Sequence, residues 1–197
     1  MRRTRLSSEQ RREQLLAIGA ELFADRPYDE VWIEAVAELA DVSRGLLYHY
    51  FPTKREFFAA VVRAESERIL RLTAPDPALP PAEQLLAGLD AYLEYVQTHP
   101  VGYRVMHRAA AAVDEGVRAV FEESLAVHQQ RIVDAVATVH GSGGPDAGVR
   151  IAARAWLMFV IAACLDWLEH AAVTREELRD LCARTLLAAV GIENTAG

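Results

Sequence analysis

Apolar residues recur at spacings of three and four throughout the chain, with polar residues between them. This period is typical of α-helices that bury one face, whereas a half-buried strand would alternate apolar and polar residues. No convincing alternating run is present. The pattern therefore predicts an all-α protein of about nine helices.

Capping residues indicate where several of these helices begin. Ser7 with Gln10 and Thr53 with Glu56 have the spacing of a capping box, and Ser43 can cap a short helix. Proline then indicates where helices stop, because it cannot continue a helix. The first predicted helix starts at Ser7 and stops before Pro27, and the others cover 33–40, 43–51, 53–72, 81–98, 101–111, 114–139, 146–171 and 174–190.

A proline-rich segment divides the chain. The stretch TAPDPALPP, residues 73–81, contains four of the eight prolines and must interrupt the helical pattern. The predicted organisation is therefore a first part over residues 1–52, a connecting helix over 53–72 and a second part over 73–197.

Composition indicates a globular protein in the cytoplasm. Of the 197 residues 52% are hydrophobic, which is enough for a sizeable core. The longest uninterrupted apolar run, residues 155–165, is shorter than the roughly 18 residues of a membrane span, and no apolar segment follows the basic N-terminus as in a secretory signal. Cys164 and Cys182 lie inside apolar helical patterns and are expected to be buried.

The net charge of −7 is unevenly distributed. Residues 1–72 carry 12 basic and 12 acidic residues, so their net charge is zero, and residues 73–197 carry 9 basic and 16 acidic residues. The first part is therefore the better candidate for contact with a polyanion. Its basic residues cluster at the start, at Arg2, Arg3, Arg5, Arg11 and Arg12.

Two short predicted helices joined across residues 41–43 have the size of a helix-turn-helix, whose second helix enters the DNA major groove. Val42, Leu47 and Phe51 are expected to face the first helix. The residues left facing outward mix apolar contact with hydroxyl, imidazole and guanidinium groups, which suits base edges and phosphates. They are Arg44, Gly45, Leu46, Tyr48, His49 and Tyr50.

Two residues are unfavourable for the helices that contain them. Gly45 costs a helix about 1 kcal/mol relative to alanine, a cost that close approach to a partner would explain. Lys54, the only lysine, puts a positive charge in the first turn of a helix, against the helix dipole. A helix N-terminus with an added ammonium is, however, a good phosphate site. Physical reasoning thus favours DNA binding over a merely packed helical corner.

The stretch VWIEAVAELADVSRGLLYHYFPTKREFF resembles the helix-turn-helix signature of TetR-type transcriptional regulators. The resemblance is carried by Ala37, by the turn Val42-Ser43, by Leu47-Tyr48 and by Phe51-Pro52 with Lys54. It covers about residues 7–60. Trp32 replaces the threonine that often opens the second helix, Asp41 replaces the usual turn glycine, and Tyr50 replaces a frequent histidine.

The resemblance implies an N-terminal three-helix helix-turn-helix DNA-binding domain and an α-helical domain for ligand binding and dimerisation. It implies a homodimeric repressor that binds double-stranded DNA at a palindromic operator and leaves it when a small hydrophobic effector binds. Base contacts are implied for Arg44, Gly45, Leu46, Tyr48 and His49, and phosphate contacts for Ser43, Tyr50 and Lys54. Trp32 has no hydroxyl to cap the helix, and it is expected either to pack or to lie along the DNA backbone as a further contact.

The helix at 146–171 supports the dimer, because it is apolar around nearly its whole circumference at 155–165 and therefore needs a second apolar neighbour. The last helix, with Leu178, Leu181, Leu186 and Leu187, is its expected companion. Bulky apolar residues with isolated polar tips also predict an effector site. The candidates are Leu89, Tyr92, Val96, Tyr103, Met106, His107, Phe121, Leu125, His128, Trp156, Phe159, Val160 and Ala163.

The sequence leaves two alternatives to this hypothesis. An enzyme is disfavoured, since the chain has no HExxH, GxSxG or CxxC motif, and neither a metal nor a cofactor is expected. The other alternative is a helix-turn-helix DNA-binding factor that responds to a protein partner or has no small-molecule ligand. An effector site in the second part would distinguish it from the ligand-responsive regulator.

Overall fold

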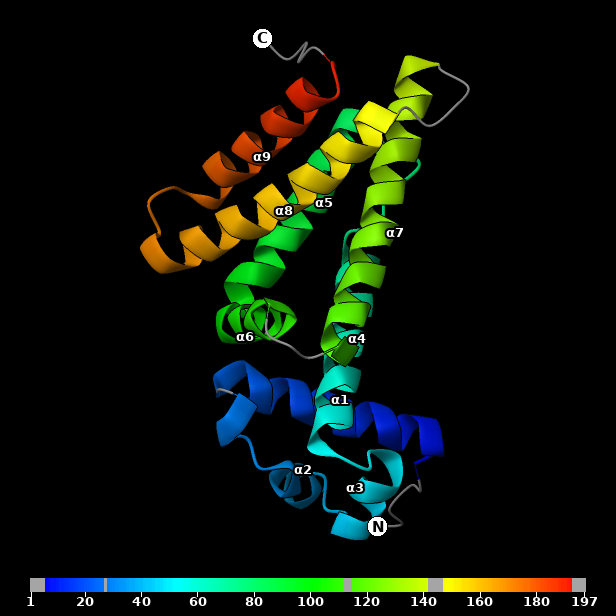
Figure 1. Cartoon of the computed structure of the whole chain (residues 1–197), viewed down its shortest axis with the longest axis vertical. Coiled ribbons are helices and arrows are strands. Elements are labelled where there is room, and N and C mark those ends of the chain that lie inside the picture. Colours follow the sequence, from blue (N-terminus) through cyan, green and yellow to red (C-terminus); the bar gives the residue numbers. More distant parts are fainter. Residues whose placement is uncertain (1–5, 27, 112–114, 142–146, 193–197) are drawn as a thin grey trace. The chain divides into compact units, whose positions relative to one another are not determined.

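The computed structural model describes residues 6–26, 28–111, 115–141 and 147–192, so the basic residues Arg2, Arg3 and Arg5 lie outside it. These residues form helices and no strand, which confirms the predicted all-α class. The elements are α1 (Ser8–Asp25), a 3₁₀ turn (Tyr28–Glu30), α2 (Ile33–Leu39), α3 (Arg44–Tyr50), α4 (Lys54–Leu72), α5 (Pro81–Thr98), α6 (Pro100–Ala111), α7 (Glu115–His140), α8 (Ala147–His170) and α9 (Arg175–Ala189) (Figure 1).

The helices begin where the capping residues predict. Ser7 and Gln10 form a complete capping box at α1, with Gln10 N donating to Ser7 Oγ at 3.1 Å. Ser43 Oγ accepts from the Leu46 amide at the start of α3, also at 3.1 Å. Local sequence thus determines these helix starts, because a side-chain oxygen satisfies an amide that has no partner within the helix.

The chain folds into two compact units. The first contains the chain up to Glu67 together with His99–Phe121, and the second contains Arg68–Thr98 together with the chain from Glu122 onward. The first unit therefore includes α6, which packs against α1, although α6 follows the proline-rich segment. The predicted division into a first part (1–52), a connecting helix (53–72) and a second part (73–197) separates the chain by function and not by compactness. It stays a prediction.

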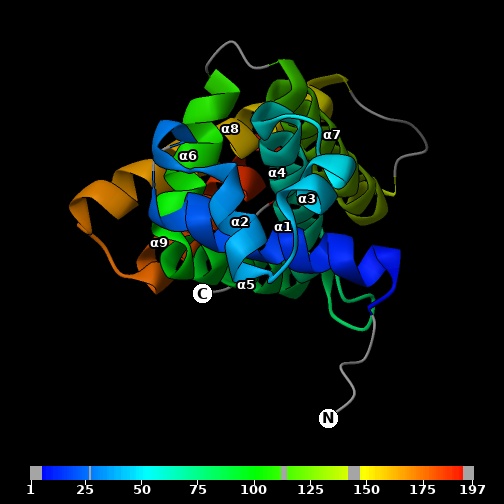
Figure 2. The ribbon, with the colours of Figure 1, turned by 90° about the horizontal axis from the view of Figure 1, so that it is seen from below.

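Aromatic side chains form the core of the first unit beneath α2 and α3. Phe23 of α1 lies 4.7 Å from Phe58 of α4 between ring centroids, and Phe51 lies 4.9 Å from Phe57. Leu47 of α3 is fully buried. These contacts hold the short helix α3 in place, since a helix of seven residues has little stability by itself. Figure 2 shows α2 and α3 with α1 in this unit.

Gly19 of α1 lies where α4 comes closest. A Cβ atom at this position would stand 2.8 Å from Phe57 Cε1 and 2.9 Å from Val61 Cγ2, inside normal contact distance. We expect Gly19→Ala to lower the free energy of unfolding by about 1–3 kcal/mol, as overpacking usually does. Urea denaturation of the full chain would measure this loss. A variant as stable as the wild type would show that α1 and α4 can move apart at no cost.

In the second unit, α9 packs against α5 and α8. The Trp156 indole N–H of α8 donates to the Cys182 carbonyl of α9 at 2.8 Å, and Arg179 of α9 binds Asp90 of α5 at 3.1 Å. Cys164 and Cys182 are fully buried, which confirms that they are core residues. Burial also raises the pKa of Cys182 to about 11, so this thiol stays protonated.

One described helix, α8, is long and apolar enough to cross a membrane, and 33% of its apolar window is buried within the protein. A single helix of this kind is weak evidence, because core helices of soluble proteins have the same length and composition. Its buried residues, among them Trp156, Val160 and Cys164, form part of the core of the second unit.

Candidate functional site

The turn between α2 and α3 has the geometry that the sequence predicts. Asp41 adopts a positive φ of 51°, the left-handed conformation expected for the residue in place of the usual glycine. Leu47 and Phe51 are buried, and Val42 is half-buried. Because these residues anchor one side of α3, the opposite side faces solvent.

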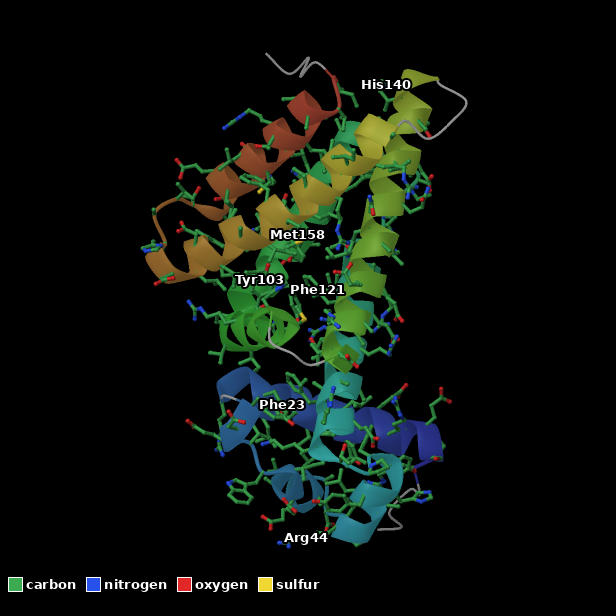
Figure 3. The ribbon with its side chains drawn as sticks, viewed as in Figure 1. Phe23, Arg44, Tyr103, Phe121, His140 and Met158 are labelled. Atoms are coloured by element: carbon green, nitrogen blue, oxygen red, sulfur yellow. The ribbon has the colours of Figure 1, made fainter. Side chains whose placement is uncertain are left out.

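The exposed side of α3 carries most of the residues predicted to contact DNA. Ser43, Arg44, Gly45, Leu46, Tyr48 and His49 are all exposed. Arg44 extends away from the ribbon at the tip of this unit (Figure 3). Tyr50 departs from the prediction: it is half-buried, and its hydroxyl lies 3.0 Å from Ser8 Oγ at the start of α1. A phosphate contact by Tyr50 would therefore be made beside α1.

Gly45 has no packing neighbour that would require a glycine. A Cβ atom there would meet only Ser43 Oγ, at 3.9 Å, which is ordinary contact. The first unit would thus accommodate alanine at this position, which would also favour the helix. The absence of a side chain is consistent with close approach of another molecule to the backbone of α3.

Two carboxylates of α2 lie beside the exposed side chains of α3. The Tyr48 hydroxyl donates a hydrogen bond of 2.8 Å to Glu34 Oε1. Glu38 Oε1 lies 4.0 Å from the Arg44 guanidinium, and both of these side chains are largely exposed. Sequence reasoning missed both carboxylates, since only the angle between α2 and α3 brings them to these partners.

Lys54 lies at the N-terminus of α4, as predicted, but its ammonium turns toward the 3₁₀ turn. Its Nζ stands 4.5 Å from the centre of the Tyr28 ring and donates to the Asp29 carbonyl at 3.4 Å. An ammonium has three N–H groups, so these contacts leave capacity for a phosphate oxygen. The cation–π contact also explains how a positive charge is tolerated in the first turn of α4.

Trp32 precedes α2 and is 75% exposed, more than any other large apolar side chain in the described part of the chain. It makes no side-chain cap at the start of α2, so the missing threonine hydroxyl is not replaced. An exposed indole offers a flat apolar face and one N–H donor. These groups fit the sugar and phosphate of a nucleic-acid backbone.

A second candidate site surrounds His107 of α6, within the first unit. The imidazole lies 4.3 Å from the Tyr103 ring and 5.2 Å from the Phe121 ring of α7, between ring centroids. Its Nε2 atom is buried and has no hydrogen-bond partner in the structure. Burial lowers the pKa of His107 to about 4, so the ring is neutral at neutral pH. A buried nitrogen without a hydrogen-bond partner destabilises the folded state by about 1–3 kcal/mol, and a ligand that supplied a partner would remove this cost.

The remaining effector candidates are distributed over both units. Tyr103, Met106 and His107 are buried and belong with half-buried Phe121 to the first unit. In the second unit Leu89, Val96, Leu125, Trp156 and Val160 are buried, and Tyr92, His128, Phe159 and Ala163 are half-buried. Trp156 uses its indole N–H to bind α9, which gives it a structural role. Burial lowers the pKa of His128 to about 4 as well.

Within the described residues, no three His, Cys, Asp or Glu side chains gather closely enough to hold a metal ion. The two sites therefore offer hydrogen bonds, apolar contact and positive charge. These groups suit recognition of another molecule.

Comparison with known proteins gives two matching family models. Residues 15–61 match the one described as bacterial regulatory proteins, tetR family. Residues 81–189 match the one described as tetracyclin repressor-like, C-terminal domain. The first match contains the whole of α2 and α3, and the second contains α5 to α9.

Individual relatives agree with these matches. The chain is 30% identical to the transcriptional activator FasR of Mycolicibacterium smegmatis over 112 residues, which are 53% of this chain and 49% of that protein. It is 26% identical to the transcriptional repressor KstR of Rhodococcus jostii, over 79% of this chain and 74% of the relative. It spans about half the length of the first relative and three quarters of the second.

Solved structures share the fold. A tetR-family transcriptional regulator from Streptomyces coelicolor superposes with a TM-score of 0.82 at 25% identity, over 93% of this chain and 82% of that one. A regulator from Pseudomonas aeruginosa, described as putative, gives a TM-score of 0.77 at 18% identity, over 95% and 94% of the two chains. At 18% identity, the second similarity shows only that the two chains share a fold.

Proposed function

The chain belongs to the TetR family of bacterial regulatory proteins and is a transcriptional regulator, and on that premise we propose that it is a ligand-responsive repressor. In this proposal a homodimer binds a palindromic operator in the cytoplasm and is released by a small, mainly apolar effector. The observation that carries the DNA-binding part is the exposed side of α3, with Arg44, Leu46, Tyr48 and His49 around an open Gly45.

Lys54 and Arg44 are expected to contribute differently to operator binding. Lys54→Ala should weaken binding to all DNA sequences alike and reduce the salt slope by about one per protomer, because a phosphate contact carries no sequence information. Arg44→Ala should also reduce the difference in binding free energy between the preferred base and the other bases, by about 1–3 kcal/mol at the base that Arg44 contacts. Fluorescence anisotropy with operator and random duplexes at several salt concentrations would measure both effects.

Arg71→Ala is a suitable control for the lost charge, because Arg71 is an exposed cation at the other end of the same helix. Lys54 also contacts Tyr28, so a thermal melt of each variant would show that the fold is intact. If Lys54→Ala changed neither the affinity nor the salt slope, Lys54 would not contact a phosphate.

The dimer is proposed from the exposed face of α8 and α9. Ile151 is 70% exposed and Met158 44% exposed, and Ala155 and Ala162 continue the same stripe at spacings of four and three. Leu181 of α9, 42% exposed, adds to it. A stripe of this spacing is typical of a helix–helix seam. A two-fold axis would pair it with its copy in a four-helix interface.

The effector is proposed to bind at His107. Its buried Nε2 atom has no hydrogen-bond partner among the described residues, and the rings of Tyr103 and Phe121 flank the imidazole. A neutral imidazole nitrogen is a donor or an acceptor according to its tautomer, and a hydroxyl group can satisfy either. The effector class that fits is an uncharged apolar molecule with a hydroxyl group. The same observation favours a small-molecule ligand over control by a protein partner.

We expect medium-chain primary alcohols to raise the melting temperature of the wild-type chain more than alkanes of the same chain length, which can neither donate nor accept a hydrogen bond. At 100 times its Kd such a ligand stabilises by about 2.7 kcal/mol. His107→Phe keeps a flat ring but has no nitrogen. In this variant the alcohol should raise the melting temperature no more than the alkane does. Differential scanning fluorimetry followed by operator-release assays would measure this.

Equal shifts for alcohol and alkane in the wild type would contradict a hydrogen bond at His107. An effector that lowers operator affinity a hundredfold must supply about 2.7 kcal/mol of coupling between the two sites. A ligand that binds but leaves operator affinity unchanged would contradict the regulatory part of the proposal. Specific retention of the chain on the DNA upstream of its own gene would separate a DNA-binding regulator from an enzyme.

A further inference from the structure

The Tyr48 hydroxyl uses its only proton in a hydrogen bond within the protein. Tyr48 lies on the exposed side of α3, and its hydroxyl donates to Glu34 Oε1 of α2 at 2.8 Å. A hydroxyl has one proton and two acceptor lone pairs, whereas an ionised carboxylate can only accept. The hydrogen bond therefore has one possible direction, and the oxygen of Tyr48 remains an acceptor toward any third group.

The electrostatics of the pair agree with this direction. The hydrogen bond from Tyr48 is the main cause that lowers the pKa of Glu34, with help from its own backbone and from the charges of Arg44 and Lys54. The same hydrogen bond raises the pKa of Tyr48. At neutral pH the carboxylate is ionised and the phenol is protonated, so donor and acceptor do not exchange roles.

Base pairs differ in what they offer such an oxygen in the major groove. Cytosine presents the N4 amino group and adenine the N6 amino group, both of which are donors. Guanine presents N7 and O6 and thymine presents O4, all acceptors, which an acceptor-only oxygen cannot pair with. An acceptor held at the groove thus separates cytosine and adenine from guanine and thymine.

We propose that Glu34 is a positioning residue that holds Tyr48 as a hydrogen-bond acceptor, so that Tyr48 selects cytosine or adenine at one position of each operator half-site. This inference rests on the proposed function, because it concerns a base contact made by α3. It deepens that function by assigning a base class to one side chain.

The carboxylate of Glu34 should also weaken DNA binding, which makes the proposal testable. DNA is a polyanion, so the negative charge of Glu34 beside α3 weakens binding to DNA of any sequence. Removal of Glu34 should therefore have two opposite effects. Affinity for random duplexes should rise, and the preference for cytosine or adenine should fall.

The experiment starts with selection of duplexes from a randomised library by the purified full-length wild-type chain. The affinities of the selected operator and of its single-base variants are then measured for each protein. For the wild type we expect one position per half-site at which cytosine or adenine binds about fivefold better than guanine or thymine. Tyr48→Phe keeps the ring but has no hydroxyl, and should abolish this preference.

Glu34→Ala should also abolish the preference, because a released hydroxyl can rotate and donate to O6 or O4 as well. It should bind random duplexes more tightly than the wild type. Glu34→Gln removes the charge, and its amide can donate to the Tyr48 oxygen as well as accept from the hydroxyl, so it is expected to weaken the preference. Glu21→Gln removes an exposed carboxylate from α1 and serves as the charge control.

Two results would overturn the inference alone: a preference unchanged in Tyr48→Phe, or a preference unchanged in Glu34→Ala. A wild-type chain that selects no sequence from the library would overturn the proposed function, and this inference with it.

Discussion

Ile151→Glu combined with Met158→Glu should convert the protein into a 21.8 kDa monomer and lower its operator affinity about 100-fold or more. Both side chains lie on the exposed apolar stripe of α8, so a two-fold interface would bring the new carboxylates close to their copies. Like charges in a desolvated interface are strongly unfavourable. Loss of the dimer then removes the gain from binding two half-sites at once.

Sedimentation equilibrium at micromolar concentration would measure the mass, and anisotropy titration the affinity. A matched control is Val127→Glu combined with Val139→Glu, because these α7 side chains are 43% and 45% exposed in the same compact unit. The control should remain a dimer. A double variant on α8 that sediments like the wild type would contradict the proposed interface.

Gly45→Ala should stabilise the protein and yet weaken its binding to the operator. Alanine at this position meets only Ser43 Oγ and favours the helix by about 0.5–1 kcal/mol. If the backbone of α3 approaches DNA closely here, the added methyl group must push it away. We expect about a tenfold loss of affinity for Gly45→Ala and about 100-fold for Gly45→Gln, since about 1.4 kcal/mol of lost contact is already a factor of ten.

Urea denaturation and operator titration of the same samples would measure the two opposite changes. Gly88→Ala is the matched control, because Gly88 lies within α5 and a Cβ atom there meets only the Thr73 carbonyl, at 3.8 Å. It should gain similar stability and keep full operator affinity. If Gly45→Ala bound the operator as well as Gly88→Ala does, Gly45 would not mark a close approach.

The sequence by itself was sufficient for the helices and for the location of the candidate DNA-binding surface. Ser7, Ser43 and Thr174 start their helices by hydrogen bonds to amides three residues away, which are purely local interactions. Periodicity was also sufficient to separate buried Leu47 from exposed Tyr48, because successive residues of a helix point about 100° apart. The other helices begin and end within one or two residues of the predicted boundaries.

Tertiary structure decided which chemical groups meet. Glu34 reaches Tyr48 only because α2 and α3 cross at the turn, and Lys54 rests on Tyr28 only because the 3₁₀ turn, which the sequence did not predict, lies beside α4. His107 is buried against Phe121, with no hydrogen-bond partner for its Nε2 atom among the described residues, only because α6 and the start of α7 pack together. Such contacts join residues distant in sequence, and periodicity and capping carry information only about neighbours within a few residues.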